Sequence, residues 1–310
     1  MIKFFKTNAL GLQTLSEIED NSWIHLVSPT EREISSVCDA IGIPRDFLMA
    51  ALDEEERARI EVEEDCTLIL VDVPLAEMHD SSVIYTTLPF GIIIAKENII
   101  TVCTKEIPLV SDFISGKIKS FYTFKKTRFI LQLLYKNATY YLNYLKQIDK
   151  MSNNIERELH KSMKNKELIQ LLDLEKSLVY FTTSLRSNEI VLEKMLKIES
   201  IKKYPEDEDL LEDVIIENKQ AIEMANIYSN ILSGTMDAFA SVISNNLNMV
   251  MKFLTSITIV LTIPTMIASF FGMNVPVPLS GQPHAFMIII AISLAISSLI
   301  AMFMVRKKLF

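Results

Sequence analysis

Hydroxyl side chains recur at regular spacing in an apolar stretch near the end of the chain. Five of them follow one another at steps of 3, 4, 3 and 4 residues: Thr255, Thr258, Thr262, Thr265 and Ser269. Steps that average about 3.5 residues place side chains on one face of a helix, at the repeat of a coiled coil. The corresponding face of a coiled coil is apolar, whereas this one is polar and small.

The same register continues beyond the apolar stretch. It passes through Asn230, Gly234, Asp237, Ser241, Ser244, Asn248 and Met251 upstream, and through Gly272 downstream. We call this set, from Asn230 to Gly272, the polar seam. Small polar residues can serve close packing between membrane helices. That alternative accounts poorly for Asp237 and Asn248, so we favour a water-filled axis shared by several copies of the chain.

The seam ends at the tripeptide Gly272-Met273-Asn274. A helix C-terminus carries roughly half a negative charge on its unpaired carbonyls, which attracts cations. Gly272 would permit a tight exit from the helix, and Asn274 adds a neutral oxygen acceptor. Neutral acceptors suit Mg²⁺, which gives up its water reluctantly and is commonly held through that water.

Two stretches are long enough to cross a membrane. Residues Phe253–Phe271 and Phe286–Val305 contain 19 and 20 residues without a charge, and about 20 apolar residues span the hydrocarbon core. A pair of buried core helices is the alternative interpretation. Basic residues flank these stretches on one side only, and this asymmetry predicts that both termini are cytosolic. The basic residues are Lys252, Arg306, Lys307 and Lys308.

The composition argues against several other classes of protein. The net charge of −8 gives no electrostatic basis for binding nucleic acid. The cysteines Cys38, Cys66 and Cys103 have no paired spacing, which is typical of reduced thiols rather than a zinc site or a disulfide framework. We find no phosphate-binding loop, dinucleotide fingerprint or nucleophile elbow, so the sequence does not predict an enzyme.

The remaining sequence predicts an α+β membrane protein. Short β-branched runs predict strands at 2–5, 23–27, 67–73, 83–87, 90–95 and 99–103, with a helix beginning in "PTEREISSVCDAIGI". After Pro108, helical spacing of apolar residues predicts a long helix, through Ile130, Leu133, Leu134, Tyr141, Leu145 and Ile148. The polar stretch 153–166 predicts a helix junction, and 167–201 a second, antiparallel helix. The predicted divisions are a cytosolic α/β domain (1–108), antiparallel helices (109–204), a stalk helix that becomes the first transmembrane helix (205–274, spanning about 250–272), an external loop (275–285), a second transmembrane helix (286–305) and a basic tail (306–310).

Two acid-rich stretches stand out in the predicted cytosolic part. Asp53–Asp65 holds eight acids and two arginines, and Glu206–Asp213 holds six acids. Most runs of this kind are solvated faces or helix-end charges. The alternative is that they face each other between subunits and bind a divalent ion.

The end of the chain resembles the CorA family of magnesium transporters, whose signature is Gly-Met-Asn after the first of two C-terminal spans. The resemblance extends over "NLNMVMKFLTSITIVLTIPTMIASFFGMN" and over "GIPRDFLMAALDEEERARIE" near the N-terminus. It implies a funnel-shaped homopentamer whose long helices line the pore. Related zinc transporters vary the middle residue of the signature, so Met273 favours magnesium.

The resemblance also implies roles for individual residues. Gly272, Met273 and Asn274 would form the selectivity filter. Asn248, Met251 and Leu254 would form the cytoplasmic end of the pore, with Met251 and Leu254 as a hydrophobic gate, and Asp237 would lie at the pore mouth. Asp213 matches one half of a regulatory Mg²⁺ site between subunits. The partner acid of the family falls on Ala50, so Asp53 or a nearby Glu would replace it.

The sequence therefore favours a passive Mg²⁺ channel of a prokaryotic cytoplasmic membrane, gated by cytosolic Mg²⁺. Its partners would be other copies of the chain, the lipid bilayer and divalent cations, with Co²⁺ and Ni²⁺ as further candidates for transport. Two alternatives stay open, a zinc or nickel transporter of the same fold and a cytosolic sensor tethered by its spans.

Overall fold

The computed structural model describes residues 1–9, 11–63, 65–79, 82–118, 120–162, 165–198, 204–275, 277–278 and 283–307. The chain divides into two compact units, Met1–Thr235 and Met236–Phe310. Helix α6 contributes residues to both, and each unit is described by itself below.

The first unit is built on a seven-stranded sheet in the order β2-β1-β3-β7-β6-β5-β4. All neighbouring strands are antiparallel except β3 and β7, which run parallel. The strands are β1 (Ile2–Asn8), β2 (Gly11–Leu15), β3 (Trp23–Val27), β4 (Arg59–Val62), β5 (Cys66–His79), β6 (Ser82–Ala95) and β7 (Asn98–Cys103).

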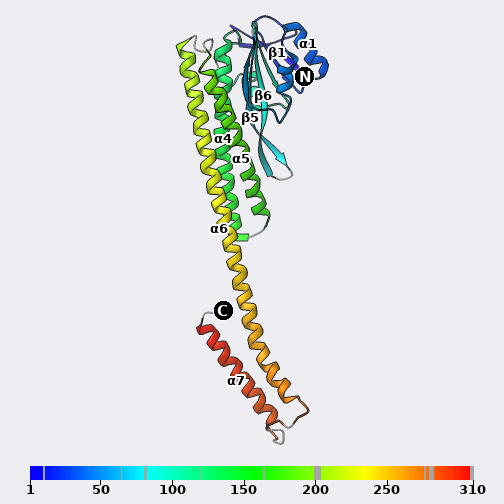
Figure 1. Cartoon of the computed structure of the whole chain (residues 1–310), viewed down its shortest axis with the longest axis vertical. Coiled ribbons are helices and arrows are strands. Elements are labelled where there is room, and N and C mark those ends of the chain that lie inside the picture. Colours follow the sequence, from blue (N-terminus) through cyan, green and yellow to red (C-terminus); the bar gives the residue numbers. More distant parts are fainter. Residues whose placement is uncertain are drawn as a thin grey trace. The chain divides into compact units, whose positions relative to one another are not determined.

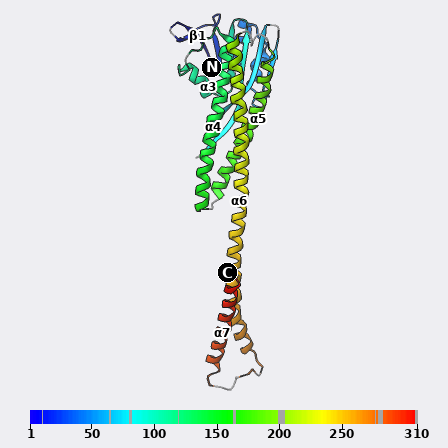
Figure 2. The ribbon, with the colours of Figure 1, turned by 90° about the vertical axis from the view of Figure 1, so that its left-hand side faces the viewer.

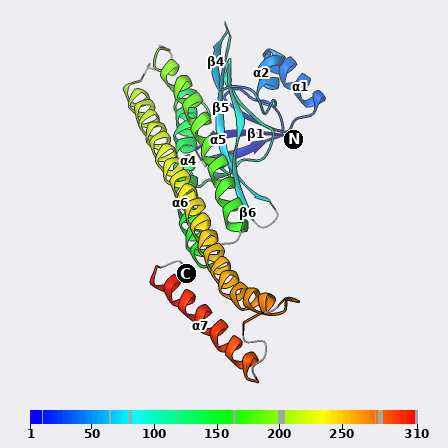
Figure 3. The same ribbon diagram turned by 60° about the horizontal axis from the view of Figure 1, so that its bottom comes forward.

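Helices cover both faces of this sheet (Figures 1 and 3). Side chains alternate between the two faces of a strand, so Trp23 packs on one side with α3 to α5, and Ile24 on the other with α1 and α2. The helices are α1 (Glu31–Ile41), α2 (Arg45–Ala50), α3 (Pro108–Ile114), α4 (Lys126–Ser162) and α5 (Asn165–Met195).

Local sequence explains the placement of α1 and α2. Thr30 and Glu33 form a capping box at the start of α1, and Gly42 ends it in the left-handed conformation at φ 80°. The end of α2 lies against β6 at Gly91, where an added Cβ would come within 2.7 Å of the Ala51 Cβ. Gly91 is therefore what permits this close packing.

The predicted strands at 83–87 and 90–95 are one continuous strand, β6, so the break predicted at Pro89 is wrong. The residues of β6 that pair with β7 are Phe90–Ala95, so this pairing does not reach Pro89, the residue just before Phe90. Since proline only lacks the donor for a ladder bond, it can occupy a strand where the neighbour on one side has ended. Strands β2 and β4 were not predicted. Both are short, poorly buried and rich in polar residues.

The helical spacing predicted after Pro108 is confirmed. Each apolar residue on which it was based lies buried in α4, namely Ile130, Leu133, Leu134, Tyr141, Leu145 and Ile148. The polar junction expected at 153–166 falls at the change from α4 to α5. The second helix, expected to reach residue 201, ends at Met195, and residues 199–203 lie outside the described ones.

Helix α6 runs from Pro205 to Phe271, as the prediction of one unbroken helix required, and Gly234 lies within it. Its N-terminal half lies beside α4 and α5 (Figure 2). Buried residues of α6 in the first unit follow a heptad spacing: Leu211, Val214, Asn218, Ala221, Ala225 and Leu232. In the second unit, α7 (Ala285–Arg306) lies beside the C-terminal part of α6 (Figures 1 and 2).

Candidate functional site

Every residue of the polar seam is exposed in the single chain. This holds for Asn230, Gly234, Asp237, Ser241, Ser244, Asn248, Met251, Thr255, Thr258, Thr262, Thr265, Ser269 and Gly272. The hydroxyl residue of the same stretch that departs from the register, Ser256, is only 2% exposed. The register of the polar seam therefore distinguishes the exposed hydroxyl side chains from Ser256, which is buried within the second unit.

Small side chains are buried on both helices of the second unit. Ser256 of α6 is buried, as are Ser293 and Ser297 of α7, which are four residues apart. Such spacing of small residues lets helices approach closely in a membrane. The sequence carried this signal in the second apolar stretch, where Ser293 and Ser297 are four residues apart, whereas the polar seam comes from the first stretch alone.

The seam lies on the opposite side of α6 from α7. In the second unit, the buried or half-buried positions of α6 include Ser256, Val260, Ile263 and Ile267. At about 100° per residue, the seam hydroxyls from Thr255 to Ser269 are centred roughly 150° from these positions. A second helix thus covers one face of α6 and leaves the polar face open.

Hydroxyl groups of the seam donate their hydrogens to their own helix. Thr258 donates to the Leu254 carbonyl at 2.9 Å, Thr262 to the Thr258 carbonyl at 2.7 Å, and Thr265 to the Leu261 carbonyl at 3.2 Å. Ser241 does the same with the Asp237 carbonyl at 3.1 Å. The oxygen lone pairs remain available. Because a hydrated cation presents water hydrogens outward, a row of acceptors suits it.

The Gly272-Met273-Asn274 tripeptide follows the last residue of α6 and is exposed throughout. The Gly272 amide donates to the Ala268 carbonyl at 2.9 Å and the Ser269 carbonyl at 3.2 Å, which continues the helical pattern. Gly272 is not among the glycines with positive φ, so the exit from α6 does not use the left-handed conformation of a glycine cap. An added Cβ would lie 3.4 Å from the Ala268 carbonyl, so the single chain leaves little extra room there.

The residues assigned to the gate and to the basic flank are also exposed. Met251 is 52% and Leu254 is 56% exposed, and both are large apolar side chains. Lys252, Arg306 and Lys307 are exposed, whereas Lys308 lies outside the described residues.

The acids assigned to regulation belong to the first unit. Asp213 is exposed on α6, and Asp53 is exposed in a turn where its carboxylate accepts the Glu55 amide at 3.0 Å. Ala50 is only 7% exposed, so an acid at that position would be buried in this chain. Within the described part of a single chain, no group of three or more His, Cys, Asp or Glu could hold a metal ion.

Several other acids of the two acid-rich stretches already have basic partners. Arg59 pairs with both Glu56 and Glu61. Arg128 lies 3.6 Å from Glu206 and 3.9 Å from Asp207, and burial raises the pKa of Asp207. The free acids of these stretches are therefore fewer than their composition suggests.

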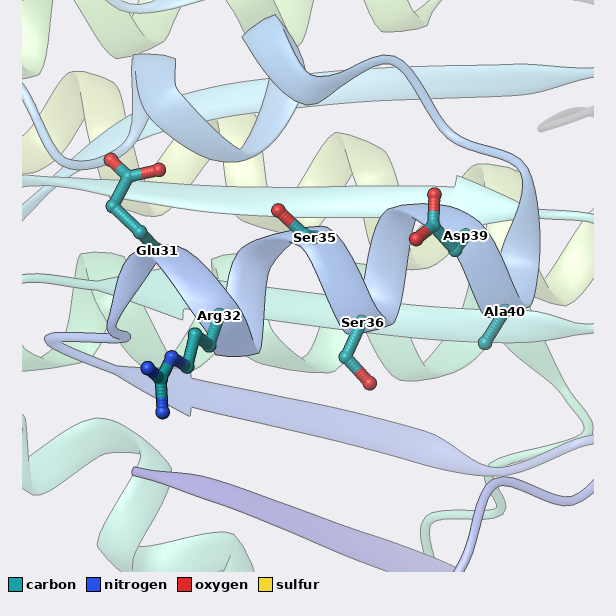
Figure 4. Close-up of a pocket in the computed structure, with 6 residues that line it drawn as sticks. All are labelled: Glu31, Arg32, Ser35, Ser36, Asp39 and Ala40. Carbon is teal, nitrogen blue, oxygen red and sulfur yellow. The ribbon is translucent and has the colours of Figure 1, made fainter.

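A broad surface depression lies elsewhere, on the outer face of α1. Figure 4 shows its lining residues Glu31, Arg32, Ser35, Ser36, Asp39 and Ala40, which all come from one helix. It is open to solvent and contains none of the residues that the sequence singled out. The exposed seam of α6 is thus the better candidate site.

Comparison with known proteins identifies the family of the chain. A family model described as CorA-like Mg²⁺ transporter protein matches residues 19–307. The chain belongs to the CorA-like family. The cobalt/magnesium transport protein CorA of Methanocaldococcus jannaschii is 29% identical over 288 residues, which cover 88% of this chain and 86% of that protein.

Solved structures support the same fold. The complete structure of the CorA magnesium transporter from Methanocaldococcus jannaschii matches with a TM-score of 0.84 at 25% identity, over 99% of this chain and 98% of that one. The full-length CmaX protein matches with a TM-score of 0.73 at 13% identity, over 98% and 96% of the two chains. At that identity CmaX supports the fold alone. The α+β architecture with two C-terminal apolar helices is therefore that of a CorA-like protein.

Proposed function

We propose that this chain forms a Mg²⁺ channel in the cytoplasmic membrane of a prokaryote, with Co²⁺ as a further transported ion. The observation that carries this proposal is the fully exposed polar seam, which lies opposite α7 and leads to Gly272-Met273-Asn274. Membership of the CorA-like family and the name of the Methanocaldococcus jannaschii relative support it.

The channel requires several copies of the chain, for which the resemblance to the family implies a homopentamer. A single seam exposes Thr and Ser oxygens in a stretch that is otherwise apolar, and exposed polar groups are unfavourable against lipid. Grouping the seams around a common axis gives them water, while α7 and the apolar side of α6 face lipid.

Selectivity would come from Asn274 and the nearby helix ends at the outer mouth. Ring-like sets of amide and carbonyl oxygens can bind a hydrated divalent ion without stripping its water. A doubly charged ion gains about 4.6 kcal/mol per 100 mV on entering a negative interior, so no chemical energy source is needed.

Regulation would reside in the first unit. Mg²⁺ bound between Asp213 of one subunit and Asp53 or a nearby Glu of another would hold the pore closed, with Met251 and Leu254 as the dry constriction. Lys252, Arg306 and Lys307, together with Lys308, would mark the cytosolic boundary, which places both termini inside.

Ion flux in liposomes tests the proposal. Purified protein should admit Mg²⁺ at a rate that rises with an inside-negative potential, and Co²⁺, Ni²⁺ and Zn²⁺ should be compared in the same vesicles. Flux no greater than in protein-free liposomes for all four ions would leave a tethered sensor as the better interpretation. Flux of Zn²⁺ or Ni²⁺ without Mg²⁺ would instead indicate a transporter of another metal on the same fold.

A further inference from the structure

Three buried asparagines from three helices meet beside the sheet in the first unit. They are Asn137 of α4, Asn188 of α5 and Asn218 of α6, each no more than 4% exposed. They line one cavity of about 10 Å³, whose other walls are apolar and include Val71 and Val214. Polar side chains around so small a space in an otherwise apolar contact require an explanation.

Hydrogen bonds to Asp72 of β5 fix the orientation of two of these amides. The Asp72 carbonyl accepts from the Asn137 Nδ2 at 2.9 Å and from the Asn188 Nδ2 at 2.8 Å. The Asp72 amide donates to the Asn188 Oδ1 at 2.8 Å. Since turning Asn137 around would set its oxygen against a carbonyl, the Asn137 Oδ1 must point away from Asp72.

That oxygen is buried and has no hydrogen-bond partner among the residues that the structure describes. Leaving a buried acceptor unpaired is costly, and a water molecule is the usual remedy. The adjoining cavity has the volume of about one water.

Asn218 is the polar member of the buried heptad face by which α6 packs in this unit. Its neighbours on that face are Leu211, Val214, Ala221 and Ala225, all buried. The Asn218 Nδ2 donates to the Leu185 carbonyl of α5 at 3.0 Å. One buried asparagine on an apolar helix face fixes the register of two helices and lowers stability somewhat, because any shift leaves its amide unpaired.

We propose that this cavity binds one water molecule, and that Asn218 with this water forms a latch that sets the axial position of α6 against α4, α5 and β5. A shift of α6 along its axis would break the bond to Leu185. Helix α6 therefore has one defined axial position in which the latch is closed. Moving α6 away from that position requires the side chains around the cavity to rearrange. The transport readout below rests on the proposed function, whereas the other readouts do not.

Asn218→Leu in the full-length protein tests the latch. Leu211→Met is a matched conservative change on the same buried face of α6. Leucine suits a heptad position, so the melting temperature should stay the same or rise. Amide hydrogen exchange in residues 211–225 should nevertheless speed up by about threefold to tenfold, the weight of one lost hydrogen bond. A lower melting temperature with unchanged exchange would assign Asn218 a merely structural role and overturn the latch.

The Mg²⁺ concentration on the cytosolic side that halves Mg²⁺ influx provides a second readout. We expect Asn218→Leu to shift it by about threefold to tenfold, and Leu211→Met to leave it within twofold of wild type. Equal shifts in both variants would overturn the latch. If wild-type vesicles admit no Mg²⁺, the proposed function fails, and the exchange experiment still decides the latch.

Asn137→Leu tests the water itself. The Asp72 carbonyl keeps the Asn188 donor and the Tyr141 hydroxyl at 3.2 Å, so the variant should fold. A high-resolution map of the wild-type protein should show density within hydrogen-bonding distance of the Asn137 Oδ1, and the variant should lose it. A wild-type map without that density would overturn the water site.

Discussion

The two units of the chain differ in how much of their structure one chain can complete. In the first unit, buried apolar residues form clusters on both faces of the sheet, and helices cover both clusters. In the second, only 6% of the most apolar window of α6 and 17% of that of α7 are buried. The first unit thus covers most of its own apolar side chains, whereas one chain leaves most of the apolar surface of the second uncovered; in the proposed channel, lipid and other copies of the chain would cover it.

Asn274→Ala should give the largest effect, because it alters the outer mouth of the proposed channel. We expect Mg²⁺ uptake to fall at least about a hundredfold, equivalent to about 2.7 kcal/mol, through loss of the amide oxygens at the outer mouth. Asn245→Ala, at an exposed asparagine of α6 outside the seam, should transport normally. Normal uptake by an assembled Asn274→Ala protein would remove this residue from the filter.

Lowering the pH should change the stability of the first unit through one buried histidine. His25 is buried with its Nδ1 2.8 Å from the Thr101 hydroxyl, and burial, with smaller contributions from Lys3 and the N-terminus, lowers its pKa from 6.5 to about 4. The unfolded chain therefore binds a proton between about pH 6.5 and 4 that the folded chain does not. Acidification through this window should cost up to about 3 kcal/mol of unfolding free energy.

The single tryptophan, Trp23, reports on this unit because it is fully buried there. Denaturant unfolding of the full-length protein, followed by tryptophan fluorescence, measures the effect of pH. His25→Gln should flatten the dependence between pH 6.5 and 4. An equally steep dependence in that variant would assign the acid sensitivity to carboxylates.

A pair of matched substitutions separates the two faces of α6. Ser256→Val introduces bulk into the contact with α7 and should cost about 1–3 kcal/mol of stability. Thr262→Val lies on the exposed polar seam, so it should change the free energy of unfolding by no more than about 0.5 kcal/mol. It should nevertheless slow Mg²⁺ uptake severalfold. Thermal stability and flux measured on the same preparations check both. The opposite pattern would mean that the seam packs against protein rather than water.

Much of this contrast could be predicted from the sequence, for reasons that particular residues make plain. The helical spacing of Ile130, Leu133 and Leu145 predicted buried positions correctly because packing follows helix periodicity. Pro89 misled the strand prediction, since the sequence does not tell where the neighbouring strand β7 ends. The function of the seam residues stays a prediction, because the proposed pore would form only between copies of the chain.

Substitutions at the proposed gate should give about a tenfold increase in leakage, the effect of about 1.4 kcal/mol on a barrier. Met251→Ser or Leu254→Gly should wet a dry constriction and raise Mg²⁺ flux at high internal Mg²⁺. Met249→Ser is a suitable control, because Met249 is exposed but lies outside the seam. Lower stability without extra leakage would assign Met251 and Leu254 to packing.

The smallest effect is expected at the regulatory acids, where one unit would act on the other. Asp53→Ala combined with Asp213→Ala should raise the Mg²⁺ concentration that protects the protein from proteolysis at least about fivefold. Asp209→Ala removes an exposed acid of the same stretch of α6 and should change nothing. Unaltered protection in the double variant would place the sensor elsewhere.

The hydrogen bonds within the seam also bear on the energy supply of the cell. Thr258, Thr262 and Thr265 each commit their hydroxyl hydrogen to a backbone carbonyl, and none of them ionises at physiological pH. A proton relay needs groups that accept one hydrogen while releasing another. These three side chains cannot do so without breaking a bond to their own helix, so they offer water-borne protons no relay of their own. A pore lined in this way would carry metal ions while its side chains contribute no short circuit to the proton gradient.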